Sequence, residues 1–523
     1  MKRILALVLA AAMVFCLSAC KGEEGSITET PMNEEIDTSK IVNLAYNSAD
    51  TFNPYTAKTT LNKNLCTLLF DPLVKIDNNL ETVNILVASD EQSGSNLVVT
   101  IKSVNFTDGT PLTSDDVVYS FNLAKQGSNR YASLLKTVES AQVRDKNSIV
   151  FTLSKADPNA INLLIFPIIK IGTDQLKTED NVYLTPIGTG RYTVNENKNG
   201  FTSNKNWHGG AVSIEKINLV NAPDNEALTH SVETGAIDYY YTDLSDCNII
   251  RMSGERVNIP LNNLVYIGLN TTFGLFSSNY ARQAVSVGIN RNTLCDEGYY
   301  NNAIAATGVF NPLWKVVSGS QTIQNISNTK IAIENLEEIG YNKKDKEGYF
   351  LNSSGKRLTI SLLVNKENTF RVNAATLISK QLAAVGIEVK IKAVEYERYT
   401  ELLKAGSFDM YIAETNIPYN MDITDLVTPS GALAYGIKKS ADKKEGDEGE
   451  AQSSWAIEKV IASYYSGVGN IPDIAVTAIS EMPIVPVCYR TGVLFTSEKI
   501  TPNELATADD IFFGFEKIKF NQK

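Results

Sequence analysis

Residues 105–121 read NFTDGTPLTSDDVVYSF and carry the most informative local pattern of this 523-residue chain. They follow an apolar run, Leu97–Ile101, that predicts a strand. The Asp108-Gly109 dipeptide predicts a turn, because glycine adopts positive φ without steric cost. Thr113, with Asp116 three residues later, matches a capping box, and apolar residues follow at helical spacing. The stretch therefore predicts a strand, a turn and a well-capped helix with one buried face.

The pattern F-x-D-G-T-P-L-T-x-D-D-V-x-Y-S-F in this stretch resembles a signature of the extracytoplasmic solute-binding proteins of family 5, the oligopeptide, dipeptide and nickel class. Further segments are similar to family motifs. They are Phe70–Val74 (FDPLV), Pro186–Tyr192 (PIGTGRY), Asn204–Gly210 (NKNWHGG), Ile237-Asp238, Arg282–Arg291 (RQAVSVGINR) and Pro483–Arg490 (PIVPVCYR). The resemblance covers nearly all of residues 41–523. One departure is Val87–Asp90, where the family carries a tryptophan and this chain has none.

The resemblance implies an α/β, two-lobed fold of the periplasmic-binding-protein type (type II, similar to cluster C), with two hinge crossings and an extra subdomain in the first lobe. From Lys330 onward the residues themselves alternate between helical and strand patterns. This alternation predicts a second α/β lobe with a mostly parallel sheet covered by helices. The expected ranges are residues 41–55, 176–262 and 484–523 for the first lobe, 56–175 for the extra subdomain and 263–483 for the second lobe.

The N-terminus has the pattern of an export signal. Lys2 and Arg3 precede an apolar run, Ile4–Leu17, that is too short to be a stable membrane anchor. The run ends in Leu17-Ser18-Ala19-Cys20, which resembles a lipobox. We therefore expect a lipoprotein signal peptide over residues 1–19.

Cys20 is then expected to carry the lipid. Two or more acyl chains, such as palmitate, anchor a protein stably where a single chain does not. The polar residues 20–40, rich in Glu, Thr, Ser and Gly, predict a flexible stalk. The expected location is the outer face of the cytoplasmic membrane, with the lipid bilayer as a partner through acylated Cys20.

Composition limits the classes of partner and cofactor. Hydrophobic content of 43% and charged content of 20% are ordinary for a globular protein, and a formal net charge of −11 without a basic stripe argues against a nucleic-acid partner. His208 and His230 are the only histidines and stand in no ligand-like cluster, so we expect no metal site and no cofactor. The mature cysteines are widely spaced, and buried free thiols are expected: Cys66, Cys247, Cys295 and Cys488.

Two lobes joined by two crossings form a hinge around a cleft, and closure buries a ligand there. The family's ligand is often an extended peptide, whose buried amine needs a carboxylate. The family's peptide binders place that aspartate, beside a tryptophan, soon after a strand like Phe408–Glu414, but this chain has Pro418 and Thr415 at those positions. The remaining candidates in this segment are Glu414, Asn416 and Asp422. Asp422 fits the start of the following helix equally well.

The other expected cleft residues come from loops and crossings that line the cleft in the family. They are Asn47, Asn53, Tyr55, Tyr241, Asp243, Asn270 and Arg490. Several have a structural alternative. Asn53-Pro54 fits a plain turn, the tyrosines at 239–241 cannot all face one way in a strand, and Arg490 suits either a ligand carboxylate or a hinge salt bridge.

The resemblance thus implies a receptor that captures a peptide or another small solute and hands it to the permease and ATPase subunits of an ABC importer, without catalysis. Nickel chelates, haem, opines and sugars use the same scaffold. An exported hydrolase is an alternative, although the chain lacks G-x-S-x-G and H-E-x-x-H motifs and has two histidines. An adhesion or signalling lipoprotein that has kept the fold is another.

Overall fold

The structure is a computed structural model and describes residues 40–127, 129–247, 250, 252–437 and 455–521. The predicted signal peptide, Cys20 and the predicted stalk up to residue 39 lie outside the described residues. Within the described ranges, no helix combines the length and apolar character that crossing a membrane requires.

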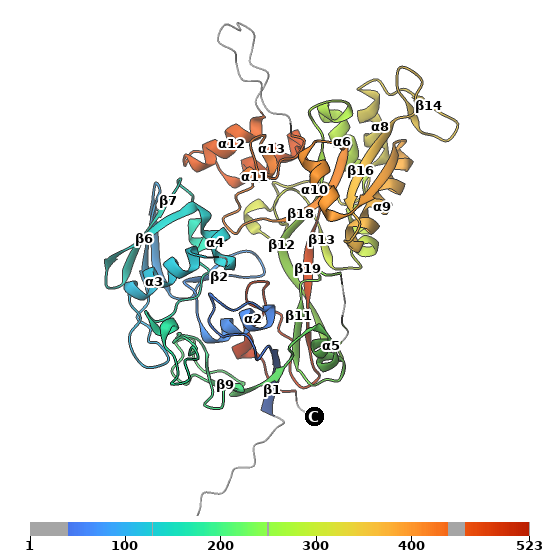
Figure 1. Cartoon of the computed structure of the whole chain (residues 1–523). Coiled ribbons are helices and arrows are strands. Elements are labelled where there is room, and N and C mark those ends of the chain that lie inside the picture. Colours follow the sequence, from blue (N-terminus) through green and yellow to red (C-terminus); the bar gives the residue numbers. More distant parts are fainter. Residues whose placement is uncertain (1–39, 128, 248–249, 251, 438–454, 522–523) are drawn as a thin grey trace, which may run out of the picture. The chain divides into compact units, whose positions relative to one another are not determined.

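One eleven-stranded sheet is the centre of the described structure (Figure 1). Its strands are β1 (Ile41–Tyr46), β8 (Tyr192–Val194), β9 (Gly200–Ser203), β10 (Lys216–Asn221), β11 (Tyr239–Thr242), β12 (Glu255–Leu269), β13 (Ala303–Ala305), β16 (Thr359–Asn365), β17 (Glu388–Val394), β18 (Met410–Asn416) and β19 (Ile484–Thr496). Their order is β17-β16-β18-β12-β19-β11-β1-β10-β9-β8, and β13 pairs with β19. The two longest strands, β12 and β19, therefore join the strands of the two predicted lobes.

The sheet is mixed, which differs from the mostly parallel sheet expected for the second lobe. Strands β17, β16 and β18 are parallel, but β18 pairs antiparallel with β12, and β12 pairs antiparallel with β19. The helix–strand alternation along the chain produces the parallel part. Strands β12 and β19 run in opposite directions between the lobes, so their pairing is antiparallel.

The first-lobe strands β1 and β10 pack under α2 (Thr60–Leu69) and against the C-terminal aromatic residues. Leu65 and Leu68 of α2, Val42 of β1 and Phe515 belong to one buried cluster. The helix α5 (Asn225–Glu233) has Asp224 as its N-cap, whose carboxylate accepts a hydrogen bond from the amide of Ala227. The predicted boundaries between lobes and subdomain stay predictions.

A second sheet lies within residues 87–153. Its strands, β4 (Val87–Ser93), β5 (Asn96–Ile101), β6 (Val138–Asp145) and β7 (Ser148–Leu153), are antiparallel in the order β4-β5-β7-β6. The helix α3 (Ser114–Lys125) packs on it through Phe121, whose ring lies edge-on to Phe151. The capping box is confirmed: the Thr113 amide donates to Asp116 at 2.9 Å, and the Asp116 carboxylate also accepts from the Thr113 hydroxyl. Beside this sheet are α4 (Arg130–Leu134) and the hairpin of β2 (Val74–Ile76) and β3 (Thr82–Asn84).

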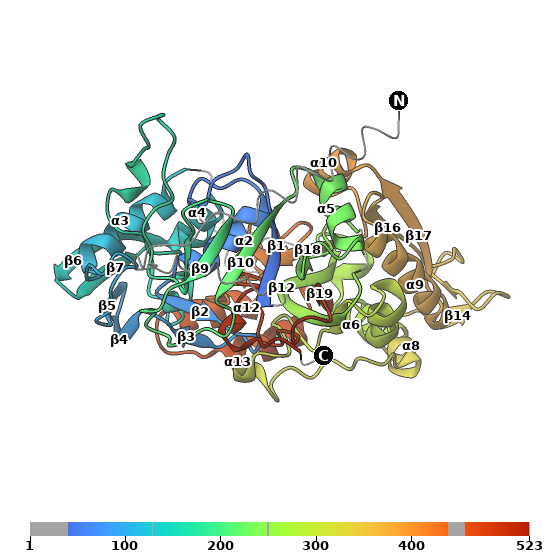
Figure 2. The same ribbon diagram turned by 90° about the horizontal axis from the view of Figure 1, so that it is seen from below.

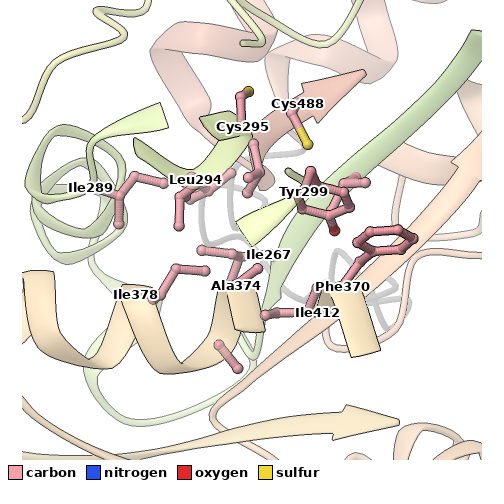
Figure 3. Close-up of a cluster of buried hydrophobic side chains, with 14 of the residues drawn as sticks. Ile267, Ile289, Leu294, Cys295, Tyr299, Phe370, Ala374, Ile378, Ile412 and Cys488 are labelled. Atoms are coloured by element: carbon pink, nitrogen blue, oxygen red, sulfur yellow. The ribbon is translucent and has the colours of Figure 1, made fainter. Parts of the chain in front are cut away.

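The second-lobe part of the main sheet is covered on both faces. Side chains alternate along β12, so that Val265 and Ile267 belong to one buried cluster and Leu264 and Tyr266 to another. The first cluster receives α6 (Asn279–Gly288), α8 (Thr329–Glu337) and α9 (Thr369–Val385), and Figure 3 shows α9 packing on the strands through Ala374 and Ile378.

The opposite face of this part of the sheet is covered by the remaining long helices. These are α10 (Tyr396–Lys404), α12 (Ala456–Tyr465) and α13 (Ile471–Glu481). A short helix, α7 (Arg291–Thr293), precedes β13 in the chain. Figure 2 shows α9 beside β16 and β17 at the end of the sheet. The cysteines of the described part are free thiols, and Cys66, Cys295 and Cys488 are buried.

Candidate functional site

A cavity of about 1340 Å³ opens where β11, β12 and β19 pass between the lobes. Its lining combines α2, α4 and α5 with β11, the middle of β12, and the chain from Glu414 to Asp425. Pockets that enclose a drug-sized molecule have about 300–1,000 Å³. This cavity is larger, so it has room for a ligand longer than a typical small metabolite.

Most of the residues expected at a ligand site line this cavity. They are Asn47, Tyr241, Asp243, Glu414, Asn416, Asp422 and Arg490. Segments separated by more than 400 residues in the sequence thus meet at one place. The binding role of each residue stays a prediction.

Asn53, Tyr55 and Asn270 lie away from the lining and are bonded to their own backbone surroundings. The Asn53 side chain accepts from the amide of Tyr55, which closes a turn, and the Tyr55 hydroxyl donates to the Pro167 carbonyl. The buried Asn270 donates to the carbonyls of Gly406 and Phe408, at 3.1 Å each. The turn alternative for Asn53-Pro54 is therefore what the structure shows.

Arg490 and Glu414 form an ion pair at the hinge. Arg490 Nη1 lies 3.2 Å from Glu414 Oε1, and Arg490 Nη2 donates to the Asp243 carbonyl at 2.6 Å. Arg371 of α9 also contacts Glu414, at 2.9 Å. Burial lowers the pKa of Arg371, but the charge and hydrogen bond of Glu414 outweigh burial and leave that pKa raised. The salt-bridge alternative for Arg490 is thus realised, and both groups of the pair also face the cavity.

Asp422 connects the second lobe with the predicted extra subdomain. One carboxylate oxygen lies 2.8 Å from Lys155 Nζ, and the other accepts from the Thr424 amide at the start of α11 (Thr424–Val427). Burial acts to raise the pKa of Asp422, but the Lys155 and Thr424 donors outweigh it and leave the pKa lowered. Asp422 therefore closes a turn just before α11, whose N-cap is Ile423, and its carboxylate also lines the cavity wall.

Further polar contacts accompany this pair, and we call the set the latch: Lys155, Asp157, Asn159 and Asn162 on one side, and Tyr419, Asn420, Asp422 and Tyr464 on the other. Asn420 Nδ2 donates to Asp157 Oδ2 at 2.7 Å, and Asn159 donates to the Asn420 carbonyl and the Tyr464 hydroxyl at 3.2 and 3.0 Å. Asn162 donates to the Tyr419 carbonyl at 3.1 Å. The latch joins the two sides of the cavity at a place other than the hinge strands.

The side chains of Asn47, Asn416 and Asp243 form hydrogen bonds with neutral groups. Asn47 donates to the Pro223 carbonyl at 3.0 Å, and the Asn416 side chain accepts from Asn263 at 3.0 Å. The exposed Asp243 carboxylate accepts from the amide of Ser245 at 2.9 Å. These three side chains retain hydrogen-bonding capacity for a ligand.

The lining also contains charged residues that the sequence did not indicate. Basic side chains come from the α2 and α4 region and acidic ones from α5, the chain after β11 and the C-terminal segment: Lys58, Arg130 and Lys136, and Asp224, Asp246 and Asp509. No local motif marks them, because each belongs to an ordinary turn or helix start. The sequence did offer one indication of a charged site, the doublet Asp509-Asp510 directly before an aromatic run. Carboxylates beside buried aromatic residues need charged or hydrogen-bonding partners.

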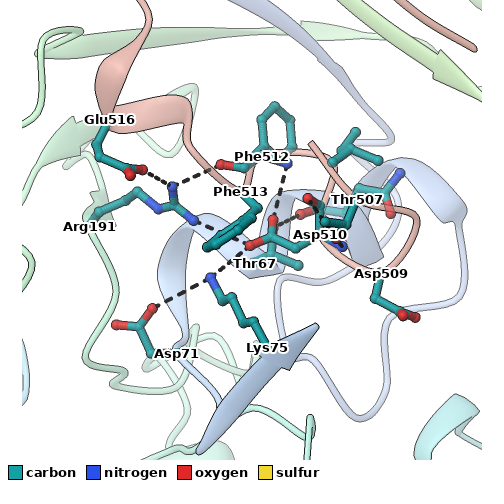
Figure 4. Close-up of polar contacts among 12 residues, drawn as sticks. Thr67, Asp71, Lys75, Arg191, Thr507, Asp509, Asp510, Phe512, Phe513 and Glu516 are labelled. Atoms are coloured by element: carbon teal, nitrogen blue, oxygen red, sulfur yellow. Dashed lines mark hydrogen bonds and ion pairs between the residues drawn. The ribbon is translucent and has the colours of Figure 1, made fainter. Parts of the chain in front are cut away.

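Several of the family motifs meet elsewhere, in a buried ionic network of the first lobe that includes Asp71 and Arg191 (Figure 4). Asp510 accepts from Lys75 Nζ at 2.7 Å and from the Thr67 hydroxyl at 2.6 Å, and Arg191 lies 3.4 Å away. Arg191 also contacts Glu516 at 2.7 Å. Burial opposes ionisation of Asp510, yet Lys75 and Arg191 outweigh it and hold its pKa below the ordinary value.

Asp71 of the FDPLV segment extends this network. Its carboxylate accepts from the indole of Trp207 at 3.1 Å and contacts His208 Nε2 at 2.8 Å. A side chain at Gly209 would lie 2.3 Å from the Trp207 ring, so this position requires glycine. The segments FDPLV, PIGTGRY and NKNWHGG therefore meet in the first lobe, outside the cavity lining, whereas Arg490 of the segment PIVPVCYR lines the cavity.

Comparison with known proteins agrees with the sequence motifs. The family described as "Bacterial extracellular solute-binding proteins, family 5 Middle" matches residues 81–432, more than half of the chain. The oligopeptide-binding protein AppA of Bacillus subtilis is 24% identical over 415 residues, which cover 75% of this chain and 76% of AppA.

Solved structures share the fold at lower identity. A murein tripeptide-binding protein, MppA, in its unliganded open form has a TM-score of 0.72 at 17% identity and covers 92% of this chain and 97% of its own. NikA from Brucella suis, in complex with Fe(III)-EDTA, has a TM-score of 0.66 at 19% identity and covers 92% of this chain and 100% of its own. These neighbours are two-lobed binding proteins, and the chain belongs to family 5 of the bacterial extracellular solute-binding proteins.

Proposed function

We propose that the protein is the lipid-anchored binding component of an ABC importer, and that it captures a peptide between its lobes and delivers it unchanged to the permease. The observation that carries this proposal is the cavity of about 1340 Å³ lined by both lobes and both hinge strands. A ligand in that position contacts both lobes at once, so its binding energy favours the closed arrangement.

A peptide suits the chemistry of the cavity better than a compact ion. Charged side chains of both signs line it, together with amide side chains that both donate and accept. The relative AppA is named for oligopeptides and MppA for a tripeptide. Glu414 and Asp422 are already paired with Arg490 and Lys155, so the exposed Asp243 is the better candidate for the ligand amine.

Capture without chemistry fits the lining as well. The cavity wall, as far as the described residues form it, has neither a histidine nor a cysteine. Serine residues of the lining therefore have no lining histidine to act as their base. His208 lies outside the lining and contacts Asp71.

Native mass spectrometry of the protein extracted from its own membranes tests the ligand class. We expect a ladder of peptide masses released on unfolding. A single non-peptide mass, such as a metal chelate, would overturn the peptide assignment. A ligand released in chemically altered form after incubation would overturn the transport role.

The anchor is tested separately at Cys20. Growth with an alkyne-bearing fatty acid should label the wild-type protein, and Cys20→Ser should abolish the label and release the protein from membranes. Equal labelling of both proteins would refute anchoring at this residue.

A further inference from the structure

A second, small cavity lies beside the large one. It has a volume of about 40 Å³, and Arg130 and Asp509 line both cavities, so these two residues stand at the boundary between them. The remaining wall is mostly apolar and includes Phe70, Ile165 and Pro167. A water molecule needs about 10–15 Å³ of such volume, so the side cavity has room for roughly three water-sized groups.

The polar groups of the side cavity are occupied by one another. Thr67 and Lys75 both donate to Asp510, at 2.6 and 2.7 Å. Arg130 Nη2 donates to the Tyr131 hydroxyl at 3.0 Å. A polar guest would therefore find few free partners inside, whereas an apolar guest would gain contact with the ring of Phe70 and the side chain of Ile165.

Asp509 is different, because it retains an unused acceptor. Its Oδ2 atom is buried without a hydrogen-bond partner, and the side chain lies opposite Tyr419 in the lining of the large cavity. An ionised carboxylate has about four acceptor positions and is costly to bury with one oxygen unpaired. A donor brought by a ligand would satisfy it at the boundary of the two cavities.

We propose that the side cavity is a specificity subsite for one small apolar side chain of a bound peptide, of alanine to valine size, and that the main-chain N–H of the same residue donates to Asp509. The proposal rests on the proposed function and deepens it. A side chain with one to three carbons fills the roughly three available positions, and leucine or phenylalanine exceeds them. The bound peptide is thereby fixed in register relative to the cleft.

The test compares equimolar synthetic pentapeptides that vary one position at a time among Gly, Ala, Val, Leu, Phe, Asp and Lys. Bound species are counted by native mass spectrometry on the full-length protein. We expect one position at which alanine and valine are enriched about tenfold over the other residues, since a single methylene in an apolar pocket discriminates by about that factor or more.

Ile165→Phe should fill the side cavity and shift the preference at that position to glycine. Ile165→Val should enlarge it and admit leucine. Ile331→Phe is the matched control, because Ile331 lies on the exposed surface of α8 in the second lobe. The residue preference of this variant for bound peptides should equal that of the wild-type protein. Circular dichroism checks that each variant folds, and the wild-type preference stands as a test even if Ile165→Phe does not fold.

The Asp509 contact has its own measurement. In a peptide whose preferred residue carries an ester oxygen in place of its N–H, binding to the wild-type protein should be weaker by about tenfold or more. The same peptide change should weaken binding to Asp509→Ala by less than about twofold. Peptide binding without any small-residue preference, or an equal ester effect in both proteins, would overturn this inference and leave the proposed function standing. No peptide binding at all would overturn both.

Discussion

The latch should control how readily the two sides of the cavity separate, and Asn420→Ala is the most informative change. The buried Asn420 side chain donates to Asp157 Oδ2 at 2.7 Å. Burial raises the pKa of Asp157, an effect that the donors Asn420 and Asn159 offset only in part. Removing the Asn420 donor leaves the Asp157 carboxylate bonded to the main-chain amide of Asn159, at 3.0 Å.

A hydrogen bond to a charged group contributes about 1.5–3 kcal/mol. Losing it should therefore lower the ratio of latched to unlatched molecules by roughly 10- to 150-fold, since every 1.4 kcal/mol is a factor of ten. The Lys155–Asp422 pair remains in the variant and is worth less, because Lys155 is 37% exposed and partly exposed ion pairs contribute about 1 kcal/mol or less.

Hydrogen exchange read by mass spectrometry measures this opening. We expect exchange at residues 155–162 and 419–424 to accelerate about tenfold or more in ligand-free Asn420→Ala. Asn416→Ala is the matched control, because Asn416 also lines the cavity but its side chain bonds Asn263 and makes no latch contact. Unchanged exchange in Asn420→Ala, or equal acceleration in the control, would refute the assignment of these contacts as a latch.

Three further predictions concern the ionic groups. Lys75→Met should lower the free energy of unfolding in urea by about 3–5 kcal/mol, because it leaves Asp510 buried without its nearest cation, and adding Asp510→Asn should recover much of the loss; additive costs would contradict the pairing. The pKa values of Asp71 and Asp510 are lowered in the folded protein. Their contribution to stability is therefore present above about pH 4 and is lost as the pH falls below it. In a pH series of urea unfolding midpoints, the loss of stability on acidification should be smaller in Lys75→Met than in the wild-type protein. Arg490→Met should weaken peptide binding measured by calorimetry more than Arg371→Met does, since Arg490 lines the cavity and bonds the Asp243 carbonyl as well as Glu414; equal effects would mean that Arg490 acts through Glu414 alone.

Much of the fold follows from short-range patterns. The strand, turn and capped helix of residues 97–125 appear as predicted, because the capping box and the Asp-Gly turn depend on atoms a few residues apart. The sheet was predicted less well. Helix–strand alternation indicates parallel neighbours, but it contains no information on the direction in which β12 and β19 enter the sheet.

The candidate site was predictable only in part. Glu414, Asp422 and Arg490 were marked by the family resemblance and do line the cavity. Asn53 and Asn270 came from the same argument, but their amides are used by nearby backbone groups. An amide in a loop looks the same in sequence whether it faces a cavity or closes a turn.

By itself, the sequence determined the family, the local elements and the presence of carboxylates and amides at the hinge, because these depend on motif wording and on neighbours in the chain. Only the tertiary structure decided which charged groups face the cavity and which are already paired. Lys155 meets Asp422 across 267 residues and Thr67 meets Asp510 across 443. The physical reason is that a polar group is available to a ligand only if folding has brought it no other partner, and those partners come from distant parts of the chain.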